Sequence, residues 1–399
     1  MKRSVYCFRK LCCILTALVC VTICCAASAS ADRHVEIQGV FSGTLDGRVL
    51  SFDLYEQENK AFAVTSLIPE YAAVMDDESG TALMSCADTV FSLCPEVITK
   101  AEQAAEQIMN SWLSQQRSES SPGMYTGELF DSASERNTYE FLLSDFLRYM
   151  NDYLRSESES AESPDPETTR VFTVIAETLQ GIVSDIHPLI RWQEYDEGRY
   201  CTILVLKQDE TVMSVSVDRT SDDGKRILIS SRENGMYCFR DCEISTDTDR
   251  CTISTAVLSG SNSSFRTAAL QAPLFTENIK IWKESDTETG FQYAAETSVL
   301  KSILVFSGMI SRMTDGAGEI SAELFLQENR DELLTISARR EPLYSAVSFS
   351  DKQIRHLDNE KEGAELQLAF ISGITMLAAE ILPALPADYQ NMLVKMIFE

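Results

Sequence analysis

The sequence predicts an α+β fold, with a curved antiparallel β-meander and packing helices in a second domain and a smaller first domain of hairpin and helices. Three observations lead to this prediction. Short strand patterns follow one another over residues 199–258, turn residues separate them, and apolar helical patterns lie on either side. Short connections of this kind are typical of antiparallel strands, since parallel strands need long crossovers.

A polar stretch divides the chain in two. Residues 155–169 read RSESESAESPDPETT and contain no apolar side chain larger than alanine. Serine, glutamate and proline in this density are typical of a linker. We therefore expect an N-terminal α+β domain at 32–154 and a β-rich C-terminal domain with bracketing helices at 170–399.

The first domain is expected to begin with a β-hairpin. Strand patterns at 35–44 and 48–55 flank Asp46-Gly47, a dipeptide that suits the positive φ angles of a tight turn. A third strand follows at 61–66. The remaining elements are a helix over 95–116 that begins at Pro95, a loop over 115–123 and a helix over 144–154.

The second domain is expected to begin with a helix over 170–187. The meander strands are predicted at 199–206, 211–217, 226–231, 236–244 and 251–258. A hairpin (279–283 and 291–295), a helix (298–313) and another hairpin (320–327 and 333–339) follow. The apolar stretch 366–382 contains Gln367 and Glu380 and is too short to cross a bilayer, so it predicts a helix buried against the sheet.

The first 31 residues have the three parts of a cleavable signal peptide. Basic residues come first, residues 11–25 are almost wholly apolar, and Ala29-Ser30-Ala31 fits cleavage before Asp32. The mature protein is therefore expected to be secreted or extracytoplasmic, in the cell envelope or the extracellular space. Lipid anchoring is disfavoured, because Cys20, Cys24 and Cys25 do not follow a small residue.

The net charge excludes some partners. The chain carries 34 basic and 61 acidic residues, a net charge of −27. Loss of the leader with its four basic residues leaves 30 against 61, a net of −31. Phosphates require neutralisation by lysine and arginine, so we expect no nucleic-acid partner. Anionic lipid surfaces repel such a chain, so we expect no membrane contact after leader cleavage.

Cysteine is concentrated in the leader. Six of the 12 cysteines leave with it, and the mature chain keeps Cys86, Cys94, Cys201, Cys238, Cys242 and Cys251. Export permits disulfides. The candidate pairs are Cys242 with Cys251, across neighbouring strands, and Cys86 with Cys94, closing a short loop. The alternative is that these cysteines are buried free thiols that pack as small apolar side chains.

The residues of common catalytic and metal sites are scarce. The three histidines, His34, His187 and His356, are far apart in sequence, and the chain has no HExxH, GxSxG or GxxxxGK[ST] motif. Aspartates at 218, 222 and 223 and at 247 and 249 fit turns better than a calcium loop. We therefore predict no metal and no cofactor, and the sequence names no catalytic residue.

These patterns predict a non-enzymatic binding or scaffolding protein. The partner would be a protein or a small apolar ligand, neither of which the sequence identifies. One alternative is a carrier that holds an apolar ligand between sheet and helix. A second alternative is a hydrolase that uses paired carboxylates, given the 61 acidic residues.

Overall fold

The computed structural model divides into two compact units, and each is described by itself. The first unit contains Met1–Leu93, Glu284–Phe291 and Ser302–Glu399, and the second contains Cys94–Lys283 and Gln292–Lys301. The structure describes residues 33–42, 48–57, 60–75, 90–158, 188–207, 210–221, 224–233, 236–260, 264–265, 273–297, 303–313, 317–327, 331–381 and 383. The predicted leader, the helix at 170–187 and most of the linker at 155–169 lie outside these residues.

The first unit is a sheet built from both ends of the chain. Its strands are β1 (Arg33–Phe41), β2 (Val49–Gln57), β3 (Lys60–Thr65), β4 (Tyr71–Met75), β15 (Leu304–Arg312), β16 (Gly318–Leu326), β17 (Asp331–Pro342) and β18 (Gln353–His356). Strand β1 pairs antiparallel with β2 on one side and with β17 on the other. The order is β15-β16-β17-β1-β2-β3-β4-β18, and among the described pairs of this unit only β18 and β4 are parallel.

The core of the first unit lies on one face of its sheet. Alternate residues of β1 and β2 face it, so Val35 and Leu54, which lie opposite each other, are each 2 % exposed. They pack with Phe91, whose side chain is 1 % exposed. Burial of these side chains removes apolar surface from water, which stabilises the unit.

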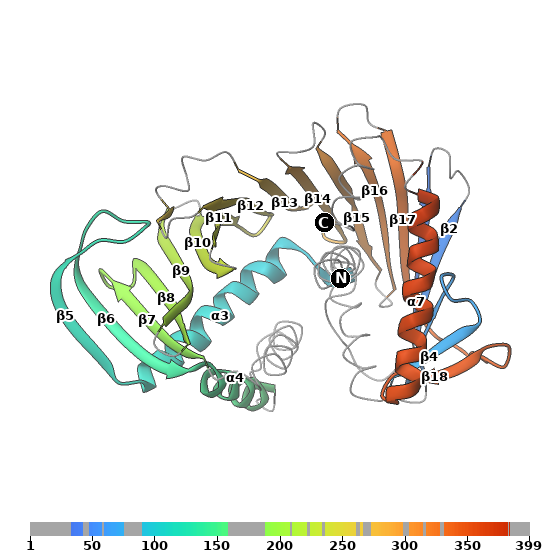
Figure 1. Ribbon diagram of the computed structural model, residues 1–399, viewed down its shortest axis with the longest axis horizontal. Coiled ribbons are helices and arrows are strands. Elements are labelled where there is room, and N and C mark those ends of the chain that lie inside the picture. Colours follow the sequence, from blue (N-terminus) through green and yellow to red (C-terminus); the bar gives the residue numbers. More distant parts are fainter. Residues whose placement is uncertain are drawn as a thin grey trace. The chain divides into compact units, whose positions relative to one another are not determined.

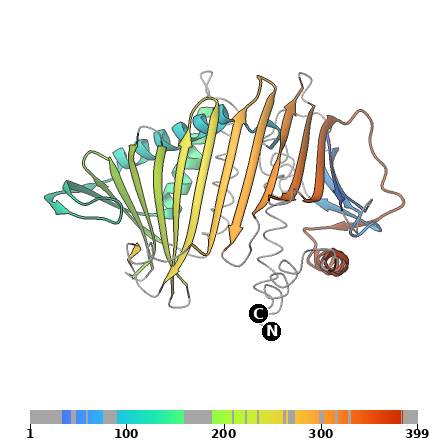
Figure 2. The ribbon, with the colours of Figure 1, turned by 90° about the horizontal axis from the view of Figure 1, so that it is seen from above.

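The second unit is an antiparallel meander. Its strands are β5 (Ser118–Tyr125), β6 (Ala133–Leu142), β7 (Leu189–Tyr195), β8 (Tyr200–Lys207), β9 (Glu210–Ser221), β10 (Gly224–Glu233), β11 (Met236–Thr246), β12 (Arg250–Gly260) and β13 (Phe275–Lys283). Each pairs with the next in the chain. Figure 2 shows these strands side by side, with two helices behind them. Strand β14 (Glu288–Thr297) begins in the first unit and ends in the second.

Two described helices cover the inside of the second unit's curved sheet. Helix α3 (Pro95–Gln115) lies along it, and α4 (Leu143–Ser158) follows β6 directly (Figure 1). Ile108 of α3 is 2 % exposed and packs against Leu147 and Met150 of α4. Nearer its end, α3 places Leu113 among sheet residues such as Ile190. The apolar stripe of α3 is therefore shared between α4 and the sheet.

The predicted α+β fold class is wrong. The described residues form 18 strands but only three helices, and the N-terminal strands join the C-terminal ones instead of building a separate small hairpin domain. Two misread segments account for much of the error. Residues predicted as a loop form β5, and part of the predicted helix over 298–313 forms β15. The antiparallel, β-rich character is confirmed, as are the predicted helices that correspond to α3 and α4.

The burial predicted for the C-terminal helix is also wrong. Helix α7 (Glu360–Ile381) buries Leu366, but Leu368 is 69 % exposed and Met376 is 63 % exposed. Apolar residues surround its axis, so one contact cannot bury them all. At the contact, Gly373 lies so near Leu67 that a Cβ atom would come within 2.6 Å of the Leu67 carbonyl oxygen. No helix within the described ranges has the length and apolarity needed to span a membrane.

Candidate binding face of the second unit

The antiparallel register sorts the side chains of the second unit onto two faces. Residues directly opposite each other on paired strands project to the same side. One row across eight strands consists of Tyr139, Trp192, Ile203, Val215, Ile229, Arg240, Val257 and Phe275. The adjacent row on the other side contains Glu140, Arg191, Leu204, Ser214, Ser230, Phe239 and Leu258. We name the side of the first row the inner face and the other side the outer face.

The inner face is largely apolar and only partly covered. Helix α3 packs on it near β6 and β7, where Ile190 is 5 % exposed and Trp192 is 6 % exposed. Farther along the same row, Val215 and Ile229 keep part of their surface exposed, as does Ile203, which also packs against the cluster that α3 covers. The next rows of this face also carry apolar residues, among them Val205, Val217, Ile227, Ile253 and Ile279. Partly exposed aliphatic surface of this kind gains free energy when an apolar group covers it.

A charged cluster attaches α3 to the inner face. Lys225 of β10 donates hydrogen bonds of 2.6 Å to carboxylate oxygens of both Glu102 and Glu106. Thr246 of β11 donates one of 2.8 Å to the other oxygen of Glu102. Partial burial opposes ionisation of Glu102, but the hydrogen bonds from Lys225 and Thr246 outweigh it and lower its pKa. Burial also opposes the charge of Lys225, yet the two carboxylates raise its pKa overall. The cluster therefore stays ionised and fixes α3.

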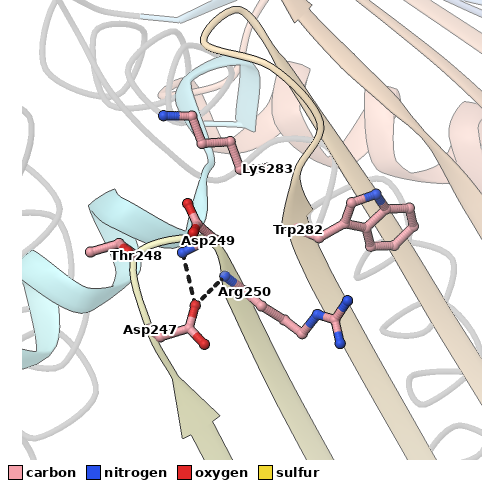
Figure 3. A pocket seen from close by; sticks show the side chains of 6 residues that line it. All are labelled: Asp247, Thr248, Asp249, Arg250, Trp282 and Lys283. Atoms are coloured by element: carbon pink, nitrogen blue, oxygen red, sulfur yellow. Dashed lines mark hydrogen bonds between the residues drawn. The ribbon is translucent and has the colours of Figure 1, made fainter.

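A pocket lies at the turn between β11 and β12. Its volume is about 350 Å³, and Figure 3 shows the six lining residues: Asp247, Thr248, Asp249, Arg250, Trp282 and Lys283. Asp247 Oδ1 accepts hydrogen bonds from the backbone N–H groups of Asp249 (2.8 Å) and Arg250 (2.6 Å). Lys283 Nζ lies 2.9 Å from Glu96 Oε1. The Asp247 carboxylate therefore stabilises the turn, and Lys283 pairs with a residue in the first turn of α3.

The structure places Cys242 and Cys251, one of the two predicted disulfide pairs, opposite other residues. Cys242 lies opposite Thr255, and Cys251 lies opposite Thr246, so the register does not bring Cys242 and Cys251 face to face. Both are free thiols, and Thr255 Oγ1 lies 3.6 Å from the Cys242 sulfur. Cys94 is a buried thiol next to α3, and Cys86 lies outside the described residues, so a Cys86–Cys94 pair stays a prediction.

Sequence reasoning did not single out Lys225, Glu102 or Arg240. A detectable signal was the alternation in β8, β9 and β10, where isoleucine and valine occupy every second position, as at 203 and 205 and at 227 and 229. That period predicts one apolar face. Nothing local pairs Lys225 with a helix that begins 130 residues earlier, at Pro95. Within the described ranges, no three His, Cys, Asp or Glu side chains are grouped as metal ligands.

Comparison with known proteins gives no family for this chain. No family model and no curated protein matches it. Among solved structures, it aligns with a BenF-like porin from Pseudomonas fluorescens Pf-5 at 7 % identity and a TM-score of 0.25, over 80 % of this chain and 99 % of that one. The P. putida toluene transporter TodX aligns at 9 % identity and a TM-score of 0.18, covering 80 % and 92 %. The outer membrane protein opdK from Pseudomonas aeruginosa aligns at 9 % identity and a TM-score of 0.14, covering 79 % and 98 %. Scores this low carry no argument about fold or function.

Proposed function

We propose that this chain is a non-enzymatic, extracytoplasmic binding protein that holds an apolar ligand against the inner face of its second unit, beside α3. The observation that carries the proposal is the row of partly exposed aliphatic residues at Ile203, Val215 and Ile229. The sequence of the leader supports the extracytoplasmic location. The proposal takes up the alternative of a carrier between sheet and helix.

The free energy of burying the inner face is large enough to bind an apolar ligand. Burial of apolar surface is worth roughly 25 cal/mol per Å², so covering about 300 Å² of sheet and ligand contributes about 7 kcal/mol. Association costs several kcal/mol in lost translational and rotational freedom. The balance fits a ligand that binds reversibly. The carboxylates nearest α3 are committed elsewhere, since Glu102 and Glu106 both bind Lys225, and they give no support to a hydrolase at this place.

The test uses adjacent residues that face opposite ways. Ile229→Asp places a carboxylate on the inner face, and Ser230→Asp places the same charge on the outer face, next to Ser214. We expect fluorescence titration with 1-anilinonaphthalene-8-sulfonate to show saturable binding that Ile229→Asp weakens at least tenfold and Ser230→Asp leaves unchanged. Val215→Thr keeps the shape of the side chain and covers the case in which Ile229→Asp fails to fold. Equal effects from both faces would refute the proposal.

A further inference from the structure

One charged residue interrupts the aliphatic row of the inner face. Arg240 of β11 lies directly opposite Ile229 of β10 on one side and Val257 of β12 on the other. Its neighbours two positions away on the same strand and the same face are Cys238 and Cys242. Among the eight residues of the row it is the one ionisable cation, and its side chain is exposed.

Several described carboxylates on the inner face have other partners. Glu277, placed on this face by its register with Thr255, accepts a hydrogen bond of 2.8 Å from the Tyr293 hydroxyl. Glu194, opposite Cys201, accepts one of 3.1 Å from the Trp192 indole. On α3, Glu102 and Glu106 bind Lys225, and Glu96 binds Lys283. The exposed guanidinium of Arg240 therefore lies among aliphatic side chains, while these acidic groups of the same face are engaged elsewhere.

A ligand that covers the aliphatic residues next to Arg240 also displaces water from the guanidinium. A purely apolar ligand would remove water from the charge without replacing the lost hydrogen bonds, and this costs free energy. A ligand with an anionic head would replace that water with charge-assisted hydrogen bonds, and the planar guanidinium binds carboxylate or phosphate oxygens in pairs. The whole chain's net charge of −27 repels anions, but Arg240 supplies a local positive charge that attracts an anionic head.

We propose that the ligand of the inner face is a single-chain anionic amphiphile, with its acidic head on Arg240 and its hydrocarbon chain across Ile229, Val215 and Ile203. This inference rests on the proposed function. Neighbouring strands lie about 4.8 Å apart, so the path from Arg240 on β11 to Ile203 on β8 spans three strand spacings, or roughly 14 Å. That length suits a medium or long hydrocarbon chain that lies across the strands.

Head-group selectivity is the first test. Calorimetric titration of the full chain would compare dodecanoate, dodecyl phosphate, dodecanol and dodecyltrimethylammonium, each below its micelle-forming concentration. We expect one or both of the anionic amphiphiles to bind at least tenfold more tightly than dodecanol, and the cationic one to bind more weakly than dodecanol. The two anionic arms show which head is preferred. Equal affinity for dodecanol and both anions would overturn the inference and leave the proposed function standing, whereas no binding of any chain would overturn both.

Variants of two arginines form the second test. Arg240→Gln removes the inner-face cation, and Arg226→Gln removes a cation that pairs with Asp241 on the outer face at 3.0 and 2.8 Å. A hydrogen bond to a charged group is worth roughly 1.5–3 kcal/mol, and each 1.4 kcal/mol is tenfold. We therefore expect Arg240→Gln to weaken dodecanoate binding by about tenfold or more, not to weaken dodecanol binding, and to be partly rescued by Arg240→Lys. Equal weakening by Arg226→Gln would show a general charge effect and overturn the inference.

Discussion

His34 lies on β1 between carboxylates from two neighbouring strands of the first unit. Its Nε2 lies 3.0 Å from Asp53 Oδ1 on β2, and its Nδ1 lies 3.7 Å from Glu341 Oε1 on β17. The imidazole stacks on Tyr55 with ring centroids 4.4 Å apart. The hydrogen bond with Asp53 raises the pKa of His34 above 6.5, although partial burial opposes this, and the charges of Asp53, Glu341 and Glu36 add to the increase.

The raised pKa makes the stability of the first unit depend on pH. Because the folded pKa lies above the unfolded value, protonation of His34 contributes stability that is fully present below about pH 6.5 and is lost as pH rises through the folded pKa. We expect thermal unfolding to show this loss in the wild type and His34→Gln to remove it. An NMR titration of His34 would report the pKa directly. His356→Gln, at an exposed position, should leave the loss intact, and a His34 pKa at or below 6.5 would contradict the prediction.

At the scale of an element, α3 depends on a small charged cluster for its position. Lys225 and Glu102 each have 28 % of their side-chain surface exposed, so water screens their attraction only in part. Lys225→Met would leave Glu102 and Glu106 beside apolar surface without their cation. We expect this to cost about 1–2 kcal/mol of unfolding free energy and to speed amide hydrogen exchange along α3.

The lowered pKa of Glu102 predicts how the stability difference between wild type and Lys225→Met changes with pH. Its folded pKa is lowered, so its contribution is present above the unfolded value of 4.5 and is lost as pH falls through the folded pKa. The stability difference between wild type and Lys225→Met should therefore shrink in acid. Lys280→Met, the same change on the outer face of β13, serves as the control. A constant difference down to pH 2 would contradict the assignment.

The elements that the sequence predicted correctly have a clear period or a clear boundary. Helix α3 begins at Pro95 as expected, because proline suits the first helical position. Strand β15 was misread because Phe306 and Ile310 are four residues apart, a spacing that fits one face of a helix and also one face of a strand. Gly308 between them suits the strand, since a Cβ atom there would clash with the Ser321 carbonyl oxygen on the paired strand.

Strand β5 was misread for another reason. Its sequence, SESSPGMY, has little apolar character, and its residues are mostly exposed. It pairs with β6 alone among the described strands, so it can fold without burying a face of its own. Pro122 and Gly123 are tolerated there because edge strands accept residues that a central strand excludes. Composition alone therefore favours a loop where the structure has a strand.

At the scale of the whole molecule, pairing between distant parts of the chain lies beyond what local patterns contain. Strand β1 pairs with β17 from Arg33 opposite Pro342 to Phe41 opposite Leu334. The hairpin of β1 and β2 was predictable from the residues that flank its turn, but the partner on its other side was not. The inner face was likewise predictable only in part. Alternation predicts an apolar face on each strand, but the register between strands is needed to place Arg240 between Ile229 and Val257.

The leader gives a direct test of where the mature protein is located. Ala31 occupies the position before the expected cut, where signal peptidase accepts small residues, and Ala29 ends a second small-x-small triplet two residues earlier. We expect the exported protein to begin at Asp32 and Ala31→Ser to be processed at the same bond. Ala31→Asp should move the cut to follow Ala29, because a charged side chain does not fit the enzyme's small pocket. The double variant Ala29→Asp with Ala31→Asp should accumulate uncleaved. N-terminal sequencing and intact mass distinguish these products, and wild-type protein that keeps residues 1–31 outside the cytoplasm would contradict the predicted cleavage.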